Sequence, residues 1–114
     1  MKLTLFTLST IAVLACGDAH AASFDCSKAS APDEFTVCDS RELSQLDVKM
    51  ATLYETVIKL VGMGVRGDLQ DQQRVFLRAR SDCGHDRMCI RNLYTARIHA
   101  LETEVTRISR GGPY

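Results

Sequence analysis

Apolar residues recur at intervals of three and four along most of the chain, a spacing that predicts amphipathic α-helices. The longest such stripe precedes Gly62 and consists of Leu43, Leu46, Met50, Leu53, Val57 and Leu60. It predicts one helix of about 20 residues, about 30 Å long, with Asp39 or Ser40 as its N-cap. No segment alternates with a period of two over enough residues to predict a strand, so the predicted fold class is all-α.

Two further stripes follow, over residues 69–83 and 90–108. Asp68 and Asp86 stand where N-caps are expected, and Gly84 stands where the first of these helices would end. A short helix is expected to begin at Pro32 and to end near Cys38. Together these elements predict a small bundle of three long helices with a short helix at the amino end.

The segment Gly62–Gly67 contains three glycines and predicts a mobile connection between two helices. It spells G-x-G-x-x-G, but a phosphate-binding loop requires a strand before it, and a helix is predicted there instead. Arg66-Gly67-Asp68 also spells an adhesion tripeptide, although Asp68 is already expected to cap a helix. A flexible linker is therefore the interpretation that the pattern favours.

The first 21 residues have the pattern of a signal peptide. Lys2 precedes an apolar run from Leu3 to Ala15, and Ala19-His20-Ala21 offers a cleavage site after Ala21. Residues 22–114 would then form one exported domain, periplasmic or secreted. The alternative is a lipoprotein box at 13–16 with a lipid anchor on Cys16. No second apolar segment follows, so no membrane span is predicted.

Export would leave four cysteines, an even number that predicts two disulfides in an oxidising compartment. Three pairings are possible, and closeness in sequence favours Cys26 with Cys38 and Cys83 with Cys89. His85 lies between the last two cysteines, so a C-x-H-x₃-C metal site can be drawn. Zinc requires reduced thiols and usually a fourth ligand. We therefore expect disulfides, and neither a metal nor a cofactor.

Charge and side-chain chemistry narrow the function classes. The chain has 14 basic and 14 acidic residues, without the net positive charge that non-specific nucleic-acid binding requires. Beyond the signal segment the histidines are His85 and His99, and neither belongs to a recognisable nucleophile–base arrangement. The sequence therefore predicts no catalytic residues and a protein that is not an enzyme.

Several polar residues lie on or beside the apolar stripes. Asp47 precedes Tyr54 by one heptad, so both project from nearly the same flank of one helix. If arginines from the later helices face them, a partly buried ionic and phenolic network forms, whose usual role is to fix helix register. The alternative is that these residues line an exposed binding groove. The full set is Asp47, Tyr54, Arg80, Tyr94 and Arg97.

These residues also carry a family resemblance. The stretch from Phe24 to Cys38, followed by Leu43, Leu46-Asp47 and Leu53-Tyr54, resembles the amino-terminal domain of the LprI-type lysozyme-inhibitor family. The carboxyl half continues the resemblance through Phe76-Leu77, Arg80, Cys83-Gly84, Cys89-Ile90, Tyr94, Arg97-Ile98 and Leu101. Phe76 departs from the pattern where the family often has Trp, and Ser81 departs where Asp or Asn is common. The resemblance implies a small exported helical domain with lysozyme as a candidate partner.

Lysozymes are usually basic, so an inhibitor gains association rate and affinity from an acidic face. Four acidic residues cluster around Cys38, although helix capping accounts for part of the cluster. The candidate contact residues are Asp33, Glu34, Asp39 and Glu42. The sequence thus predicts an exported protein-binding domain that inhibits a lysozyme, or alternatively an envelope interaction module with a different protein partner and no lysozyme activity.

Overall fold

The computed structural model describes residues 22–111, and every regular element in that range is helical. The elements are η1 (Cys26–Lys28), α1 (Pro32–Asp39), α2 (Arg41–Leu60), α3 (Met63–Asp82) and α4 (Arg87–Ser109). The prediction of an all-α fold is confirmed for these residues. The predicted signal segment and Cys16 lie outside the described range. Within that range, no helix combines the length and the apolar character needed to cross a membrane.

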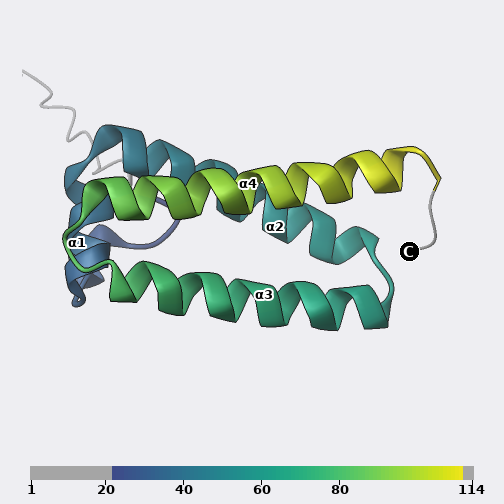
Figure 1. Ribbon diagram of the computed structural model, residues 1–114, viewed down its shortest axis with the longest axis horizontal. Coiled ribbons are helices and arrows are strands. Elements are labelled where there is room, and N and C mark those ends of the chain that lie inside the picture. Colours follow the sequence, from purple (N-terminus) through teal and green to yellow (C-terminus); the bar gives the residue numbers. More distant parts are fainter. Residues whose placement is uncertain (1–21, 112–114) are drawn as a thin grey trace, which may run out of the picture.

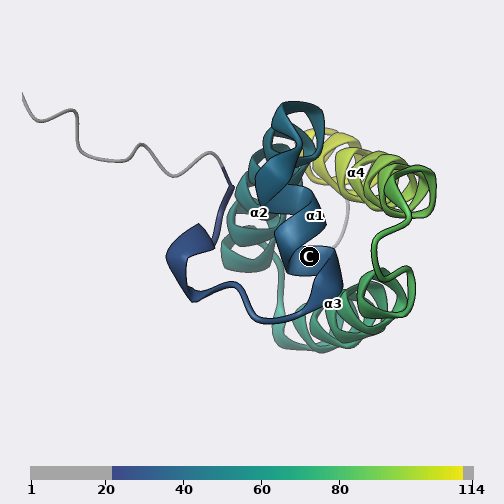
Figure 2. The ribbon, with the colours of Figure 1, turned by 90° about the vertical axis from the view of Figure 1, so that its left-hand side faces the viewer.

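The three longer helices lie roughly along one direction, and α1 lies at one end of them (Figure 1). Helices α2 and α4 run in the same direction, and α3 runs antiparallel to both (Figure 1). The end-on view places α2, α3 and α4 around α1, with the chain from residue 22 to α1 looping outside α2 (Figure 2). Among these helices, α2 packs most extensively against α4, whereas α3 has fewer neighbours and touches mainly α4 and α1.

The apolar core lies chiefly between α2 and α4. Its fully or almost fully buried members there are Leu43, Met50, Val57, Ile90, Ile98 and Leu101. The third helix adds Leu69 and Phe76, and the Phe76 ring meets the ring of Tyr94 edge-on with 5.3 Å between centroids. Because α3 contributes so few buried side chains, it is attached to the bundle along a narrow stripe that leaves both of its flanks open.

Two disulfides brace the end of the bundle at which α1 lies. Cys26 is bonded to Cys38 and joins η1 to α1, and Cys83 is bonded to Cys89 and joins α3 to α4. The pairing favoured by sequence proximity is therefore confirmed. Between α3 and α4 the chain turns at Gly84, whose φ of 57° is a conformation that favours glycine.

The prediction of a mobile linker over Gly62–Gly67 is wrong. Only Val61 and Gly62 separate α2 from α3, and Gly64 and Gly67 lie within α3. The reason is Arg66, whose Nε and Nη2 donate to the carbonyl oxygens of Ile58 (3.0 Å) and Val61 (3.0 Å). These bonds satisfy carbonyls that the end of α2 leaves unpaired, so the hairpin closes tightly. Asp68 accordingly lies inside α3 and is not its N-cap.

Local contacts set the ends of α1 and α2, and Ser40, one of the two N-caps predicted for α2, is confirmed. Ser40 caps α2 through its Oγ, which accepts a hydrogen bond from the Leu43 amide (3.3 Å). The N-cap of α1 is Ala31, and the Glu34 carboxylate accepts a hydrogen bond from the Ala31 amide (3.1 Å). Leu60 is 53% exposed and Val61 is 3% exposed, because the extended backbone after α2 turns Val61 into the core in its place.

Candidate functional site

Four buried polar side chains, one from each α-helix, meet at the end of the bundle near α1. Arg80 of α3 donates from Nε to Asp33 Oδ2 of α1 (2.7 Å) and from Nη1 to the hydroxyl of Tyr94 on α4 (3.1 Å). Its Nη1 also lies 3.7 Å from Oδ1 of Asp47 on α2, which accepts from the Tyr94 hydroxyl (2.8 Å). We call Asp33, Asp47, Arg80 and Tyr94 the four-helix network. It fixes the mutual placement of all four helices.

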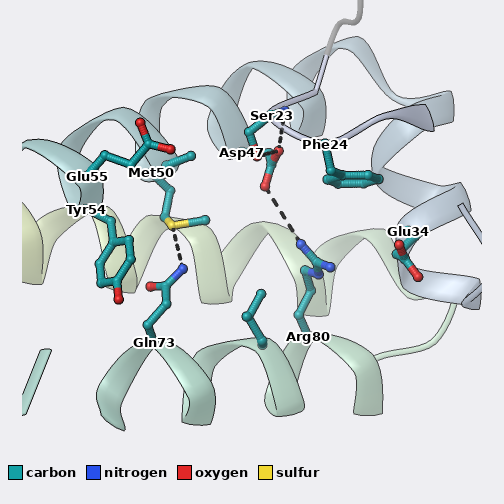
Figure 3. Close-up of a pocket in the computed structure, with 11 residues that line it drawn as sticks. Ser23, Phe24, Glu34, Asp47, Met50, Tyr54, Glu55, Gln73 and Arg80 are labelled. Carbon is teal, nitrogen blue, oxygen red and sulfur yellow. Dashed lines mark hydrogen bonds and ion pairs between the residues drawn. The ribbon is translucent and has the colours of Figure 1, made fainter. Parts of the chain in front are cut away.

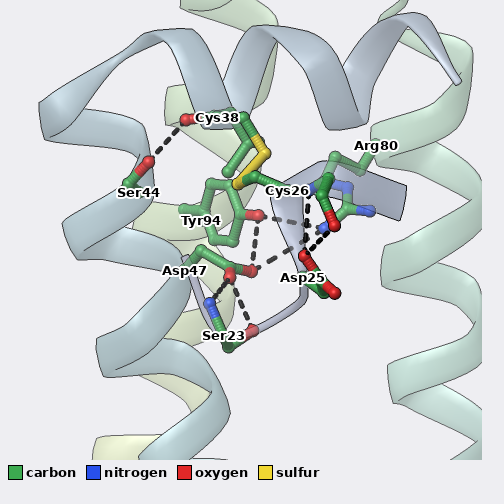
Figure 4. Close-up of a disulfide and its surroundings, with 10 residues drawn as sticks. Ser23, Asp25, Cys26, Cys38, Ser44, Asp47, Arg80 and Tyr94 are labelled. Carbon is green, nitrogen blue, oxygen red and sulfur yellow. Dashed lines mark hydrogen bonds and ion pairs between the residues drawn. A yellow bond between two sulfur atoms is a disulfide. The ribbon is translucent and has the colours of Figure 1, made fainter. Parts of the chain in front are cut away.

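The segment before α1 closes over this network. The amide and the hydroxyl of Ser23 both donate to Asp47 Oδ2, at 2.7 Å and 2.5 Å. The Phe24 ring lies against Arg80, with 5.6 Å between its centroid and the guanidinium carbon. The disulfide from Cys26 to Cys38 lies beside the same group of side chains (Figure 4). Both oxygens of Asp47 are thus satisfied, whereas the buried Oδ1 of Asp33 has no hydrogen-bond partner among residues 22–111.

Burial and neighbouring charges set the protonation of the network. Burial, reinforced by the charge of Asp47, raises the pKa of Tyr94 far above its ordinary value, although Arg80 acts in the opposite direction. Burial by itself would lower the pKa of Arg80, but its contacts with Tyr94 and Asp33 outweigh that effect and raise it. At neutral pH the tyrosine is therefore a neutral donor and the arginine a fixed cation.

We expect Tyr94 to remain un-ionised for as long as the protein is folded. Its raised pKa means that the unfolded chain releases the proton first, near pH ~10. The stabilisation is therefore complete below that pH and is lost as the pH rises further, by up to ~1.4 kcal/mol per pH unit. The measurement is a phenolate absorbance titration combined with unfolding at each pH. Tyr94→Phe should remove this pH dependence, and Tyr54→Phe is the control that should retain it. Ionisation of Tyr94 at its ordinary pKa in the folded protein would contradict the prediction.

A second polar cluster surrounds Arg97 of α4, nearer the middle of the bundle. Arg97 donates to the side-chain oxygens of Gln73 (3.0 Å) and Gln72 (3.1 Å) and to the carbonyl of Leu69 (3.3 Å). Its guanidinium carbon lies 6.0 Å from the centroid of the Tyr54 ring on α2, and burial lowers the pKa of Arg97. The five polar residues singled out in the sequence thus belong to two clusters.

A groove of about 310 Å³ lies between α2 and α3 beside the four-helix network. Its lining includes the carboxylates of Glu34, Asp47 and Glu55 and one cationic side chain, Arg80. Figure 3 shows Glu55 and Tyr54 toward one end of this groove, and Phe24 and Glu34 toward the other. Asp47 and Tyr54, which the heptad spacing placed on one flank, both line it. We call this concavity the acidic groove.

A second groove, of about 440 Å³, lies on the other flank of α3, against α4. It is lined mainly by apolar side chains, and Val75 at its edge is 56% exposed. Its apolar members are Val75, Phe76, Ala79, Leu93, Ala96 and Ala100. We call it the apolar groove.

The acidic residues expected around Cys38 do not form one free surface. Asp33 is 2% exposed and paired with Arg80, so the prediction that it contacts a partner is corrected: it is part of the network. Glu34 is partly buried and caps α1, and Glu42 pairs with Arg91 (2.8 Å). Asp39 is exposed at the end of α1. At the end of the bundle near α1, negative charge therefore comes both from carboxylates that line the groove and from the exposed acidic residues near Cys38.

The histidines lie apart from both grooves. His85 Nδ1 is 3.1 Å from the hydroxyl oxygen of Thr36, and His99 is exposed on α4. Cys83 and Cys89 are bonded to each other, so neither offers a thiolate to the metal site that their spacing allowed. Over residues 22–111 no group of three or more potential ligands is arranged to hold a metal ion.

Sequence reasoning missed four residues of these sites, two before the first helix and two on the helices. Ser23 and Phe24 precede every helix and carry no spacing pattern, and Glu55 and Gln73 look like ordinary solvated helix residues.

Comparisons of the chain with models of known protein families, with curated proteins and with solved structures found no match.

Proposed function

We propose that this protein is an exported, non-catalytic protein-binding domain of the periplasm or the cell exterior, with a lysozyme-type muramidase as its first candidate partner. The single observation that carries the proposal is the acidic groove, a concavity with three carboxylates and one guanidinium in its lining. Lysozymes are usually basic, so a negatively charged concavity is complementary to their surface. The resemblance to the LprI-type family supports the same partner.

The scaffold is suited to presenting such a surface. The Cys26–Cys38 disulfide and a polar network that joins four helices hold the groove walls in place, and the Cys83–Cys89 disulfide joins α3 to α4. A preorganised surface loses little conformational entropy on binding. Disulfides also persist in the oxidising compartments that an exported protein occupies.

A second candidate function rests on the apolar groove. Exposed apolar concavities often mark sites of protein contact, and this one places Val75 and Leu93 on facing helices. An envelope module that uses this face would bind a different protein partner and would leave muramidases unaffected.

The proposal is tested by muramidase inhibition. We expect the oxidised, exported protein to inhibit a chicken-type, goose-type or invertebrate-type lysozyme on bacterial cell walls at stoichiometric concentrations. Inhibition should weaken as salt rises, because the screening length falls from ~10 Å at 0.1 M to ~3 Å at 1 M ionic strength. Absence of inhibition of all three classes at large excess would contradict the muramidase proposal. Inhibition that is independent of salt would contradict the role of the acidic groove.

A further inference from the structure

We propose that the acidic groove binds the side chain of an arginine or lysine presented by a protein partner. This inference rests on the proposed function, because it names the chemical group that the binding domain recognises. The groove has an excess of negative charge, carboxylates that remain available to a ligand, and an apolar surface between them.

The charge of the groove is negative because its one cation is already engaged. Arg80 is almost entirely buried and is bound to Asp33 and Tyr94, with Asp47 at 3.7 Å. Two carboxylates therefore share one guanidinium, and within the part of the chain that the structure describes one oxygen of Asp33 receives no hydrogen bond. An incoming anion would meet this excess of negative charge, whereas an incoming cation would be attracted by it.

Two carboxylates remain available to a ligand. Glu55 is exposed and makes no ion pair with any residue of the described range. Oε1 of Glu34 accepts a hydrogen bond from the Ala31 amide, and its Oε2 makes no hydrogen bond to any residue of the described range. The two side chains lie toward opposite ends of the groove in Figure 3. Asp47, in contrast, is saturated by Ser23, Tyr94 and Arg80 and serves as a fixed negative charge.

The surface between these carboxylates is apolar and aromatic. Met50 and Ala51 of α2 and Leu77 of α3 line the groove, together with the rings of Phe24 and Tyr54. A ligand that suits this lining combines an aliphatic stem with a cationic end, which is the chemistry of lysine and arginine side chains. Aromatic rings add a preference for the planar guanidinium of arginine.

The experiment is a titration of the isotopically labelled, oxidised protein with N-acetyl-arginine amide, followed by amide chemical shifts. We expect saturable shifts concentrated at Ala51, Glu55 and Gln73, and no such shifts with the neutral isostere N-acetyl-citrulline amide. Glu34→Gln and Glu55→Gln should each weaken binding by about two- to fivefold, and the double variant by about tenfold. Gln at position 34 retains an oxygen that can accept from the Ala31 amide, so α1 keeps its cap. Asp82→Asn, which changes an exposed acid at the end of α3 and outside the groove, is the matched control and should bind as the native protein does.

Shifts at other positions, equal binding of citrulline amide, or unchanged affinity in the Glu34→Gln/Glu55→Gln variant would each overturn the inference. Tighter binding of free spermidine than of an arginine-containing peptide would also overturn it, because the ligand would then be a small polyamine and not a protein side chain. Muramidase assays separate the two proposals. Inhibition that survives in the double variant would leave the proposed function standing and remove the groove from it. Groove binding without inhibition would retain the inference and exclude a muramidase as the partner.

Discussion

Replacement of Arg80 by methionine is expected to lower the free energy of unfolding by about 3 to 5 kcal/mol. The substitution removes the cation that faces two buried carboxylates, Asp33 and Asp47, and leaves their charges uncompensated. It also removes the hydrogen bond that Arg80 donates to the Tyr94 hydroxyl. The free energy of unfolding of a small domain is only about 5 to 15 kcal/mol, so this single change would remove a large part of it. Urea unfolding followed by far-ultraviolet circular dichroism measures the effect.

The matched control is Arg91→Met, which breaks the exposed pair between Arg91 and Glu42. Exposed pairs contribute about 0 to 1 kcal/mol, so the control should unfold almost as the native protein does. Neutralising the two carboxylates as well, in Arg80→Met/Asp33→Asn/Asp47→Asn, should recover part of the loss, because no uncompensated charge remains buried. A cost for Arg80→Met no greater than that for Arg91→Met would show that the network does not hold the helices together.

The long helices could be predicted because each buries a continuous apolar stripe, and a stripe is visible in the sequence at its own period. Their ends were harder to predict because end groups are satisfied by contacts that periodicity does not record. Three glycines between 62 and 67 indicated a linker. The structure continues as helix there because Arg66 reaches back to two carbonyls of α2, at Ile58 and Val61. A long side chain bridging two helices leaves no local pattern that distinguishes it from a solvated arginine.

The residues of the four-helix network could be recognised in part, because the apolar stripes that predict the helices also show which polar residues lie on or beside them. Asp47, Arg80 and Tyr94 stand out as polar residues on or beside apolar stripes. Asp33 looks like a surface residue in the sequence because it clusters with other acidic residues near Cys38, and helix capping offers the other explanation for a carboxylate in the first turn of a helix. Its burial depends on α1 docking against Arg80, which lies 47 residues later in the chain. That contact follows from tertiary packing and not from local sequence, as do those of Ser23 and Phe24.

Replacement of both Cys26 and Cys38 by serine is expected to lower the free energy of unfolding by about 3 kcal/mol in the chain-entropy model. The bridge closes a sequence separation of 12 residues, against 6 for Cys83 and Cys89, whose removal should cost about 2 kcal/mol. The longer loop restricts the unfolded chain more strongly. The two double variants, compared in urea under identical oxidising conditions, provide each other's control, and a larger loss on removing the shorter loop would contradict the model.

The two bridges should also differ in what they do to the acidic groove. Without Cys26–Cys38, the segment that carries Ser23 and Phe24 is tethered only by its own contacts, and Asp47 Oδ2 depends on Ser23 for both of its donors. We expect the Ser23 amide to lose hydrogen-exchange protection in that variant and arginine amide binding to weaken with it. Without Cys83–Cys89, the turn keeps Gly84 and the hydrogen bond that the backbone amide of residue 89 donates to the Asp86 carboxylate, so the groove should stay intact. Full protection of the Ser23 amide in Cys26→Ser/Cys38→Ser would instead mean that the four-helix network holds the groove wall by itself.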